Sequence, residues 1–149
     1  MTECYFVQSD LSTIDGNKKL IQEAKVKLGK IDTLINNAGT FQDTDFESIN
    51  EEKFDETFNL NVRGYMFTSK EFVKQISNDQ NNTSIICIGS SNSLAAEKNS
   101  VMYDTSKGAV LMMIKSMAVS LASKNIRVNG IGPGTVSYTH LTLPTNREV

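Results

Sequence analysis

The chain has 149 residues, 39% of them hydrophobic, which is the size and apolar content of one folded α/β domain. Its 15 basic and 17 acidic side chains leave a formal charge of −2, which argues against a nucleic-acid-binding surface. No apolar run approaches the roughly 18 residues that a membrane helix needs, and the N-terminus lacks the basic-then-apolar pattern of a signal peptide. We therefore expect a cytoplasmic protein with a small-molecule partner.

The first half of the chain alternates strand-like and helix-like segments. Residues 4–7 predict a short strand, and an amphipathic helix is expected over residues 13–28, where Gly29 ends it. Residues 31–35 predict a second strand that runs directly into a loop. The side chains expected on the inner face of the helix are Ile14, Leu20, Ile21, Ala24 and Leu28.

The second half continues this alternation. Ser48 and Glu51 form a capping-box pattern, which predicts the start of a long helix that continues to about residue 76. Strands are predicted over residues 84–88 and 126–131, on either side of a helix over residues 101–123. The inner face expected for the long helix comprises Phe54, Phe58, Asn61, Tyr65, Thr68 and Phe72. This order of elements predicts a parallel sheet with helices on both faces.

The cysteines give no sign of a covalent framework. Cys4 and Cys87 each lie alone in an apolar stretch, and no spacing fits a disulfide set or a metal cluster. We expect both to be buried structural thiols, and we expect no metal site.

The helix expected over residues 101–123 carries two polar side chains that can perform acid-base chemistry. Tyr103 and Lys107 are four residues apart, so both emerge on one face of the helix. An ammonium group favours the ionised form of a neighbouring phenol, and such a pair can exchange a proton with an alcohol or carbonyl near neutral pH. In isolation the pair is weak evidence, because this spacing occurs by chance on many helices.

Two further polar residues strengthen this interpretation. Ser90 follows an apolar strand at its carboxyl end, where open parallel sheets present ligand-binding groups, and its hydroxyl can donate to a carbonyl oxygen. Asn61 occupies an otherwise apolar helical face, where an unpaired buried amide would be costly. It is either a functional group or a structural amide bonded to the main chain. The loop Asn36-Asn37-Ala38-Gly39 also follows a strand, and its small residues would let a flat cofactor approach the backbone.

Together these residues resemble the short-chain dehydrogenase/reductase family, over about residues 4–134. The matching motifs, in chain order, are Asp10-Leu11, Asn36-Asn37-Ala38-Gly39, Asn61 followed by Val62-Arg63-Gly64, Ser90, Tyr103 with Lys107, and Gly132-Pro133-Gly134. The resemblance implies a Rossmann-like, doubly wound α/β fold and hydride transfer between NAD or NADP and an alcohol or carbonyl substrate.

The resemblance also implies a role for each residue. Tyr103 would exchange the proton, and Lys107 would hold the nicotinamide ribose hydroxyls and favour the phenolate of Tyr103. Ser90 would orient the substrate oxygen, with Ser91 as the second candidate, and Asn61 would anchor a water that connects Lys107 to solvent. The expected cofactor contacts are Asp10, Leu11, Asn37, Ala38, Gly39, Tyr103, Lys107, Pro133 and Gly134. We also expect the parent protein to be a homo-oligomer.

The family begins with two strands and a Gly-rich phosphate loop that have no counterpart here. We therefore expect residues 1–135 to form a partial dinucleotide-binding and catalytic domain with an open apolar edge at the strand over residues 31–35. Such a chain should be inactive and bind no dinucleotide. Neither the choice between NAD and NADP nor the substrate can be read from it.

The C-terminal segment breaks the pattern. Residues 136–149 resemble the translation of a sequencing-library adapter, which predicts a non-native tail and no role for His140, the single histidine.

Two other functions share parts of this pattern. A non-catalytic dinucleotide-binding regulator is the main alternative, although it need not retain Ser90, Tyr103 and Lys107. A sugar-nucleotide epimerase of the extended branch shares the Tyr-Lys pair, but the loop over residues 36–39 resembles that of the simpler oxidoreductases.

Overall fold

The computed structural model describes residues 3–77 and 82–134; the predicted tail over residues 136–149 lies outside them. Three strands form one parallel sheet in the order β1-β2-β3, namely β1 (Thr33–Asn36), β2 (Ser84–Ile88) and β3 (Arg127–Ile131). All three strands expected from residue 31 onward are thus confirmed, with ends that differ by at most two residues.

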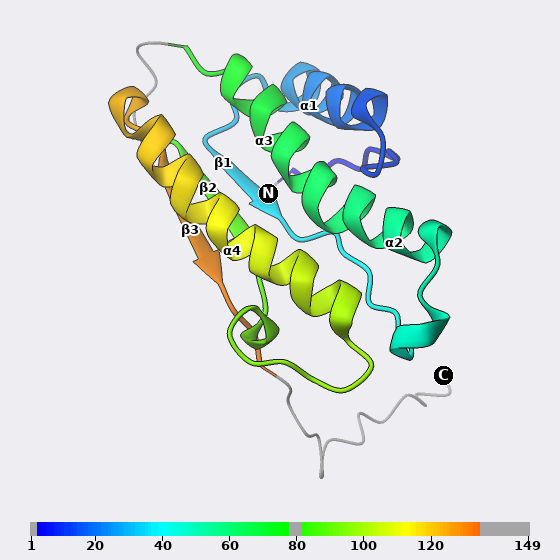
Figure 1. Cartoon of the computed structure of the whole chain (residues 1–149). Helices are drawn as coiled ribbons and strands as arrows, with labels where there is room; N and C mark the ends of the chain where they lie inside the picture. Colours follow the sequence, from blue (N-terminus) through cyan, green and yellow to red (C-terminus); the bar gives the residue numbers. More distant parts are fainter. Residues whose placement is uncertain (1–2, 78–81, 135–149) are drawn as a thin grey trace, which may run out of the picture.

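The long helices all lie on the same side of this sheet (Figure 1). α1 (Ile14–Leu28) packs against α3 (Tyr65–Lys74), which contacts β1, while α4 (Val101–Leu121) packs against β3. The expectation of helices on both faces is therefore wrong for the described residues. The segment from α2 (Glu51–Phe58) to α3 connects β1 to β2, and α4 connects β2 to β3, in the same direction across the sheet. Right-handed crossovers of this kind place their helices on one face, and only a reversal of strand order would place a connecting helix on the other.

The strands show this one-sided burial residue by residue. Ile85 and Cys87 are fully buried beneath the helices, in a core that includes Phe72 and Val110. Ile35, which pairs with Ile86 on the opposite face, remains 58% exposed. The sheet therefore presents an apolar face, and among the described residues no strand pairs with the outer edge of β1.

We expect Ile35→Thr to raise the soluble, monomeric fraction of this chain, because the substitution adds a polar group to the open face and keeps a β-branched side chain. Leu34→Thr is the matched control, since Leu34 points the other way and packs against the core. It should lower stability instead. Light scattering and thermal unfolding distinguish the two, and equal solubility of Ile35→Thr and the unmodified chain would contradict the prediction.

The strand expected over residues 4–7 does not form. Residues 3–10 have no regular secondary structure, and Phe6 is 84% exposed. A strand needs a neighbour for its backbone N–H and C=O groups, and the described sheet offers none here. Cys4 is exposed in consequence, so the expectation of two buried thiols holds only for Cys87.

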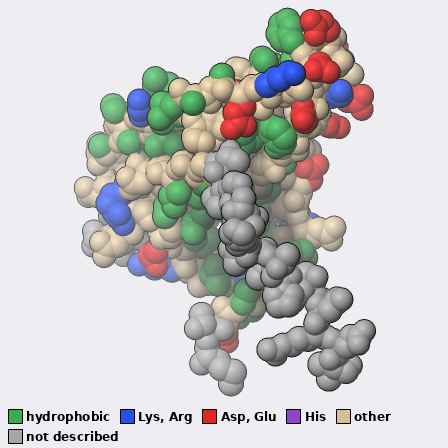
Figure 2. All heavy atoms as spheres, turned by 90° about the horizontal axis from the view of Figure 1, so that it is seen from below, with side chains coloured by type: hydrophobic (Ala, Val, Ile, Leu, Met, Phe, Trp, Pro, Cys, Tyr) green, Lys and Arg blue, Asp and Glu red, His purple; other side chains and the backbone are tan. Residues whose placement is uncertain are grey.

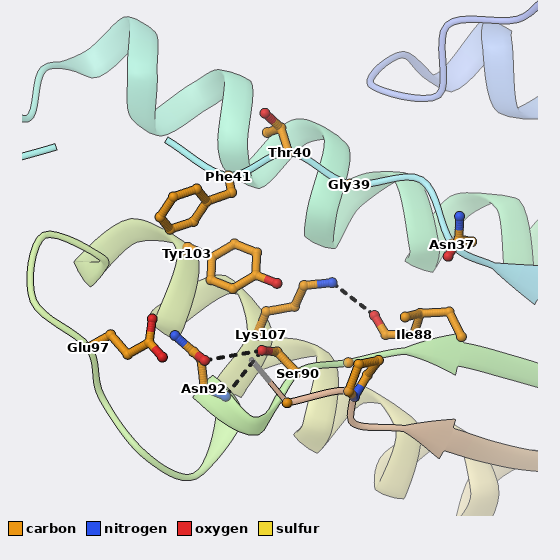
Figure 3. A pocket seen from close by; sticks show the side chains of 13 residues that line it. Asn37, Gly39, Thr40, Phe41, Ile88, Ser90, Asn92, Glu97, Tyr103 and Lys107 are labelled. Atoms are coloured by element: carbon orange, nitrogen blue, oxygen red, sulfur yellow. Dashed lines mark hydrogen bonds between the residues drawn. The ribbon is translucent and has the colours of Figure 1, made fainter. Parts of the chain in front are cut away.

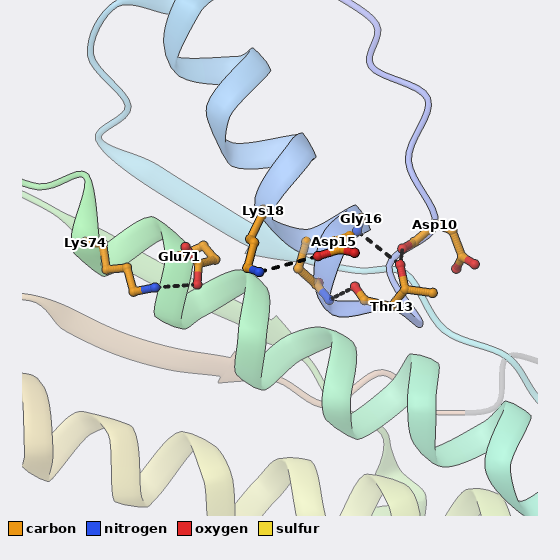
Figure 4. Close-up of polar contacts among 8 residues, drawn as sticks. Asp10, Thr13, Asp15, Gly16, Lys18, Glu71 and Lys74 are labelled. Carbon is orange, nitrogen blue, oxygen red and sulfur yellow. Dashed lines mark hydrogen bonds and ion pairs between the residues drawn. The ribbon is translucent and has the colours of Figure 1, made fainter.

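The ends of α1 follow the local chemistry of the sequence. The Thr13 hydroxyl accepts a hydrogen bond from the Gly16 N–H at 3.0 Å and begins the helix, as Figure 4 shows. Gly29 ends it with φ +71°, a conformation that favours glycine, and donates its N–H to the Lys25 carbonyl. The buried side of α1 is more polar than expected, because Asn17 is fully buried with Ile21 and accepts a hydrogen bond from Thr68 on α3.

The long helix begins two residues later than the capping box predicts. Phe46–Ser48 form a separate short 3₁₀ turn, η1, and Ile49 is extended, so the chain direction is reset after Ser48. Asn50 becomes the cap of α2 (Glu51–Phe58), and its side-chain oxygen accepts from the Lys53 N–H at 2.9 Å.

The helical stretch that begins with α2 changes its winding around Asn61. α2 leads into the π-helical segment η2 (Asn59–Gly64) before α3 resumes ordinary winding. The wider turn rotates the helix face, so Phe54, expected inside, is 45% exposed and Thr57 is buried instead. The fully buried side chains that follow in this helical stretch are Asn61, Tyr65, Thr68, Ser69 and Phe72. π-helical turns of this kind are frequent at functional sites.

Candidate active site

A pocket of about 370 Å³ opens where the carboxyl ends of the three strands meet α4. The loop after β1 contributes Asn37, Gly39, Thr40 and Phe41, and the end of β2 contributes Ile88, Gly89, Ser90 and Asn92. Glu97 from the following loop, Tyr103 and Lys107 from α4, and Pro133 and Gly134 after β3 complete the lining. The structure therefore brings most of the expected site residues to one cavity.

Tyr103 and Lys107 lie one helical turn apart and both face this pocket (Figure 3). Lys107 Nζ lies 5.6 Å from the centroid of the Tyr103 ring. Phe41 meets that ring edge-on, with centroids 5.2 Å apart and planes at 88°, and so restricts its position. The phenol is thus held between an aromatic ring and an ammonium group.

Main-chain and aromatic groups hold Lys107 in place. Only 4% of the residue is exposed, and Nζ donates to the Ile88 carbonyl at 2.8 Å. The buried Tyr65 hydroxyl donates to the same carbonyl at 3.2 Å, and burial raises the pKa of this phenol, so it remains a donor. One carbonyl at the end of β2 therefore fixes both groups.

Burial lowers the pKa of Lys107, an effect that the nearby Cys87 partly opposes. At pH values between the lowered pKa of Lys107 and its ordinary value of 10.5, this side chain binds more protons in the unfolded chain than in the folded chain. The contribution of Lys107 to stability should therefore rise with pH across this interval. We expect the free energy of unfolding of the unmodified protein, relative to that of Lys107→Met, to increase as the pH rises through the lowered pKa toward 10.5 and then to level off. Denaturant titrations at several pH values test this, and a flat difference would contradict it.

Asn61 is fully buried, and its amide group makes three hydrogen bonds. Its oxygen accepts from the Thr40 N–H at 2.8 Å, and its nitrogen donates to the Thr40 carbonyl at 2.9 Å and to the Ser106 hydroxyl at 3.0 Å. Asn61 does not line the pocket, but it lies directly behind Gly39: a Cβ at that glycine would come within 3.3 Å of its oxygen. Of the two alternatives left open, the structural amide is therefore present, and it supports the wall of the pocket.

Ser90 is the serine that faces the pocket. Its hydroxyl accepts from the Asn92 N–H at 3.1 Å and so caps the short 3₁₀ turn η3 (Ser91–Ser93). Ser91, the second candidate, is not among the lining residues, and its N–H donates to the Pro133 carbonyl at 2.8 Å. Ser91 therefore ties the strand ends together, and Ser90 is better placed to meet a ligand.

Three expected cofactor contacts do not reach the pocket. Asp10 and Leu11 lie ahead of α1, where the Asp10 carboxylate accepts from the hydroxyl and N–H of Ser12. These bonds lower the pKa of Asp10. Ala38 lies between Asn37 and Gly39 but does not line the cavity.

Sequence reasoning missed Phe41, Asn92 and Asp104. Phe41 is the one that a signal could have revealed, because an aromatic residue directly after a small-residue loop is a candidate wall for a flat ligand. Asp104 accepts from the Asn92 side-chain amide at 2.8 Å, and both residues lie on loops or faces that only the folded chain brings together.

The surface around the site is acidic on one side. Figure 2 views the molecule from below, and acidic side chains gather over the end that carries η1 and α2. The exposed carboxylates of this segment are Asp43, Asp45, Glu47, Glu51, Glu52, Asp55 and Glu56. They give this side of the site a negative potential.

Comparison with known proteins is consistent with this geometry. The family model described as short chain dehydrogenase matches residues 1–149. The chain is 33% identical over 126 residues to 2-dehydro-3-deoxy-D-gluconate 5-dehydrogenase of Dickeya dadantii, covering 85% of this chain and 50% of that protein. It is 33% identical over 148 residues to 7alpha-hydroxysteroid dehydrogenase of Bacteroides fragilis, covering 97% and 56%.

A solved structure shows a similar fold. A Tyr-to-Phe variant of ElxO with NADPH bound superposes with a TM-score of 0.80 at 27% identity, covering 87% of this chain and 52% of that one. The fold is thus Rossmann-like, and the chain spans about half the length of the curated relatives it matches. No helix within residues 3–77 and 82–134 is long and apolar enough to span a membrane.

Proposed function

This chain belongs to the short-chain dehydrogenase family, and on that premise we propose that its parent protein transfers a hydride between NAD or NADP and an alcohol or carbonyl compound. By parent protein we mean a product of family length that contains these residues. The proposal includes a small-molecule substrate, a cytoplasmic location and a homo-oligomeric state. Residues 1–135 would form the partial catalytic domain, and residues 136–149 a non-native tail.

The donors and the space at the pocket fit the nicotinamide end of a dinucleotide. A Lys ammonium has three donors, and within the described residues Lys107 Nζ has one hydrogen-bond acceptor, the Ile88 carbonyl. Gly39 leaves the space beside Nζ open, because a Cβ there would lie only 3.8 Å from that nitrogen. When bound, the nicotinamide would supply the hydride chemistry. Asn37, Gly39, Pro133 and Gly134 would line its site, with Ala38 beside them and with Asp10 and Leu11 toward the adenine.

The chain's own residues would manage the proton and the substrate oxygen. Tyr103 would exchange the proton with that oxygen, held in place by Phe41 and next to the positive charge of Lys107. Ser90 would donate to the same oxygen and orient it. Lys107 would bind the ribose hydroxyls, and Asn61 would anchor a water between Lys107 and solvent, while its amide holds the Thr40 segment.

One observation carries this proposal: a nearly fully buried lysine with spare donors lies beside a pocket-facing phenol and across from a serine hydroxyl. The experiment is to assay the parent protein with NADH and NADPH on diacetyl and ethyl acetoacetate as carbonyl probes, and with NAD⁺ and NADP⁺ on cyclohexanol as an alcohol probe. Turnover with any probe supports the proposal. Cofactor binding without turnover, unchanged when Ser90 and Tyr103 are replaced, would favour a non-catalytic dinucleotide-binding regulator.

We expect the 149-residue chain by itself to bind neither dinucleotide. The described residues offer donors for the nicotinamide ribose but no Gly-rich turn of backbone N–H groups for a pyrophosphate. Adding NADH or NADPH should therefore leave its thermal unfolding unchanged. A cooperative transition that shifts upward with either cofactor would contradict this expectation.

A further inference from the structure

Two side chains, Asp104 and Asn92, connect α4 to Ser90, the serine that faces the pocket. The Asn92 amide nitrogen donates to Asp104 Oδ1 at 2.8 Å, and the Asn92 oxygen accepts from the Ser90 hydroxyl at 3.3 Å (Figure 3 shows Asn92 beside Ser90). Asp104 directly follows Tyr103 on α4, so it links the helix that carries the phenol to the loop that carries the hydroxyl. The second oxygen of Asp104 accepts from the Glu97 N–H at 3.0 Å.

The carboxylate determines which way the Asn92 amide faces. A carboxylate can only accept hydrogen bonds, so the NH₂ of Asn92 must point to Asp104 and its oxygen must point to the serines. A hydrogen bond to an ionised acceptor is about twice as strong as a neutral one, which makes this orientation the dominant one. The Ser91 hydroxyl also donates to the Asn92 oxygen, at 3.4 Å.

The amide orientation in turn determines the role of the Ser90 hydroxyl. The Ser90 hydroxyl oxygen accepts a hydrogen bond from the Asn92 backbone N–H at 3.1 Å. The same hydroxyl donates its hydrogen bond to the side-chain oxygen of Asn92. Because that second bond is long, Ser90 can exchange it for a bond to a substrate oxygen at small cost.

We propose that Asp104 and Asn92 are a positioning pair that keeps the Ser90 hydroxyl a hydrogen-bond donor toward the substrate oxygen. This inference rests on the proposed function, in which Ser90 orients that oxygen. Neither Asp104 nor Asn92 needs to contact the reacting atoms: both act through Ser90.

Asp104→Asn tests the direction of these hydrogen bonds, because it replaces the carboxylate with an amide of nearly the same shape. The Glu97 N–H donates to this side chain, so we expect the new amide to keep its oxygen toward Glu97 and to turn its NH₂ toward Asn92. Asn92 would then reverse and present its own NH₂ to Ser90, which would become an acceptor. We expect kcat of the parent protein with diacetyl to fall about tenfold, with little change in KM for the cofactor.

The double exchange Asn92→Asp with Asp104→Asn should restore activity. The new amide at position 104 would donate to the new carboxylate at position 92 and still accept from the Glu97 N–H. The second oxygen of that carboxylate would again accept from the Ser90 hydroxyl. In a Ser90→Ala background, Asp104→Asn should cause no further loss, because the pair has nothing left to orient. The exposed Asp55→Asn is the matched control for removal of a carboxylate.

The outcomes separate this inference from its premise. The positioning pair is supported if kcat falls in Asp104→Asn, recovers in the double exchange and falls no further when Asp104→Asn is added to Ser90→Ala. A further fall of kcat in the Ser90→Ala background would show a merely structural role for Asp104 and would overturn the inference. If the unmodified parent has no turnover, the proposed function fails, and NMR still tests the pair. In Asp104→Asn, nuclear Overhauser contacts of the Asn92 amide protons should move from position 104 to Ser90, and their persistence at position 104 would overturn the inference.

Discussion

Replacing Tyr103 with Phe is expected to lower kcat of the parent protein by about 10²- to 10⁴-fold, the usual contribution of a positioned acid-base group. The ring contact with Phe41 does not involve the hydroxyl, so the aromatic wall of the pocket should persist. KM for the carbonyl probe should therefore change much less than kcat. Steady-state kinetics with diacetyl and the preferred cofactor measure both.

Tyr5→Phe is the matched control for this substitution. Tyr5 is partly exposed and its hydroxyl bonds to Glu3, outside the pocket. Tyr5→Phe removes a phenolic hydroxyl as Tyr103→Phe does, but from a side chain that does not line the pocket, so turnover should be unchanged. Full activity of the Tyr103 variant would remove that phenol from the mechanism.

Lys107→Met is expected to reduce kcat/KM by about 10²- to 10³-fold, comparable to the loss of one preorganised electrostatic donor. The substitution keeps length and apolar volume but removes the charge beside Tyr103 and the donors offered to the ribose. Cofactor affinity, measured by titration calorimetry, should fall together with turnover.

Stability should not fall with activity in this variant. Burial of the ammonium is costly, and the Ile88 carbonyl keeps the Tyr65 hydroxyl as a donor, so that carbonyl is not left unpaired. Thermal unfolding at neutral pH should be unchanged or shifted upward. The exposed Lys115→Met, two turns further along α4, should leave turnover intact. A variant that loses both activity and stability would indicate that Lys107 mainly supports the fold.

Elements with complete local signals were predictable from the sequence. α1 begins at a residue that can cap it and ends at a glycine with positive φ, so both ends matched. β2 matched residue for residue because it is a short apolar run between polar segments. The strand over residues 4–7 has the same local signal, but a strand also needs a neighbour, and sequence pattern alone does not supply one.

The site was predictable where its members share one element or one sheet edge. Tyr103 and Lys107 meet because of helical periodicity, and Ser90 joins them because parallel strands end together. Asn92 and Asp104 were not predictable, because their contact depends on how the loop over residues 91–97 folds back onto α4. The capping box at Ser48 misled because Asn50, two residues on, is an equally good cap and begins the helix after the η1 turn.

The Ile88 carbonyl at the end of β2 accepts from both Lys107 and Tyr65. The position of the Lys107 charge therefore does not depend on which side chain stands at position 88. The ammonium and the Tyr65 phenol both anchor to a peptide oxygen of the central strand, which every residue type at position 88 would supply. Mutational drift at that position could therefore alter the uncovered side of the sheet while leaving the charge where it is. Relocating the charge would require a shift in strand register, which the core beneath Ile85 and Cys87 opposes.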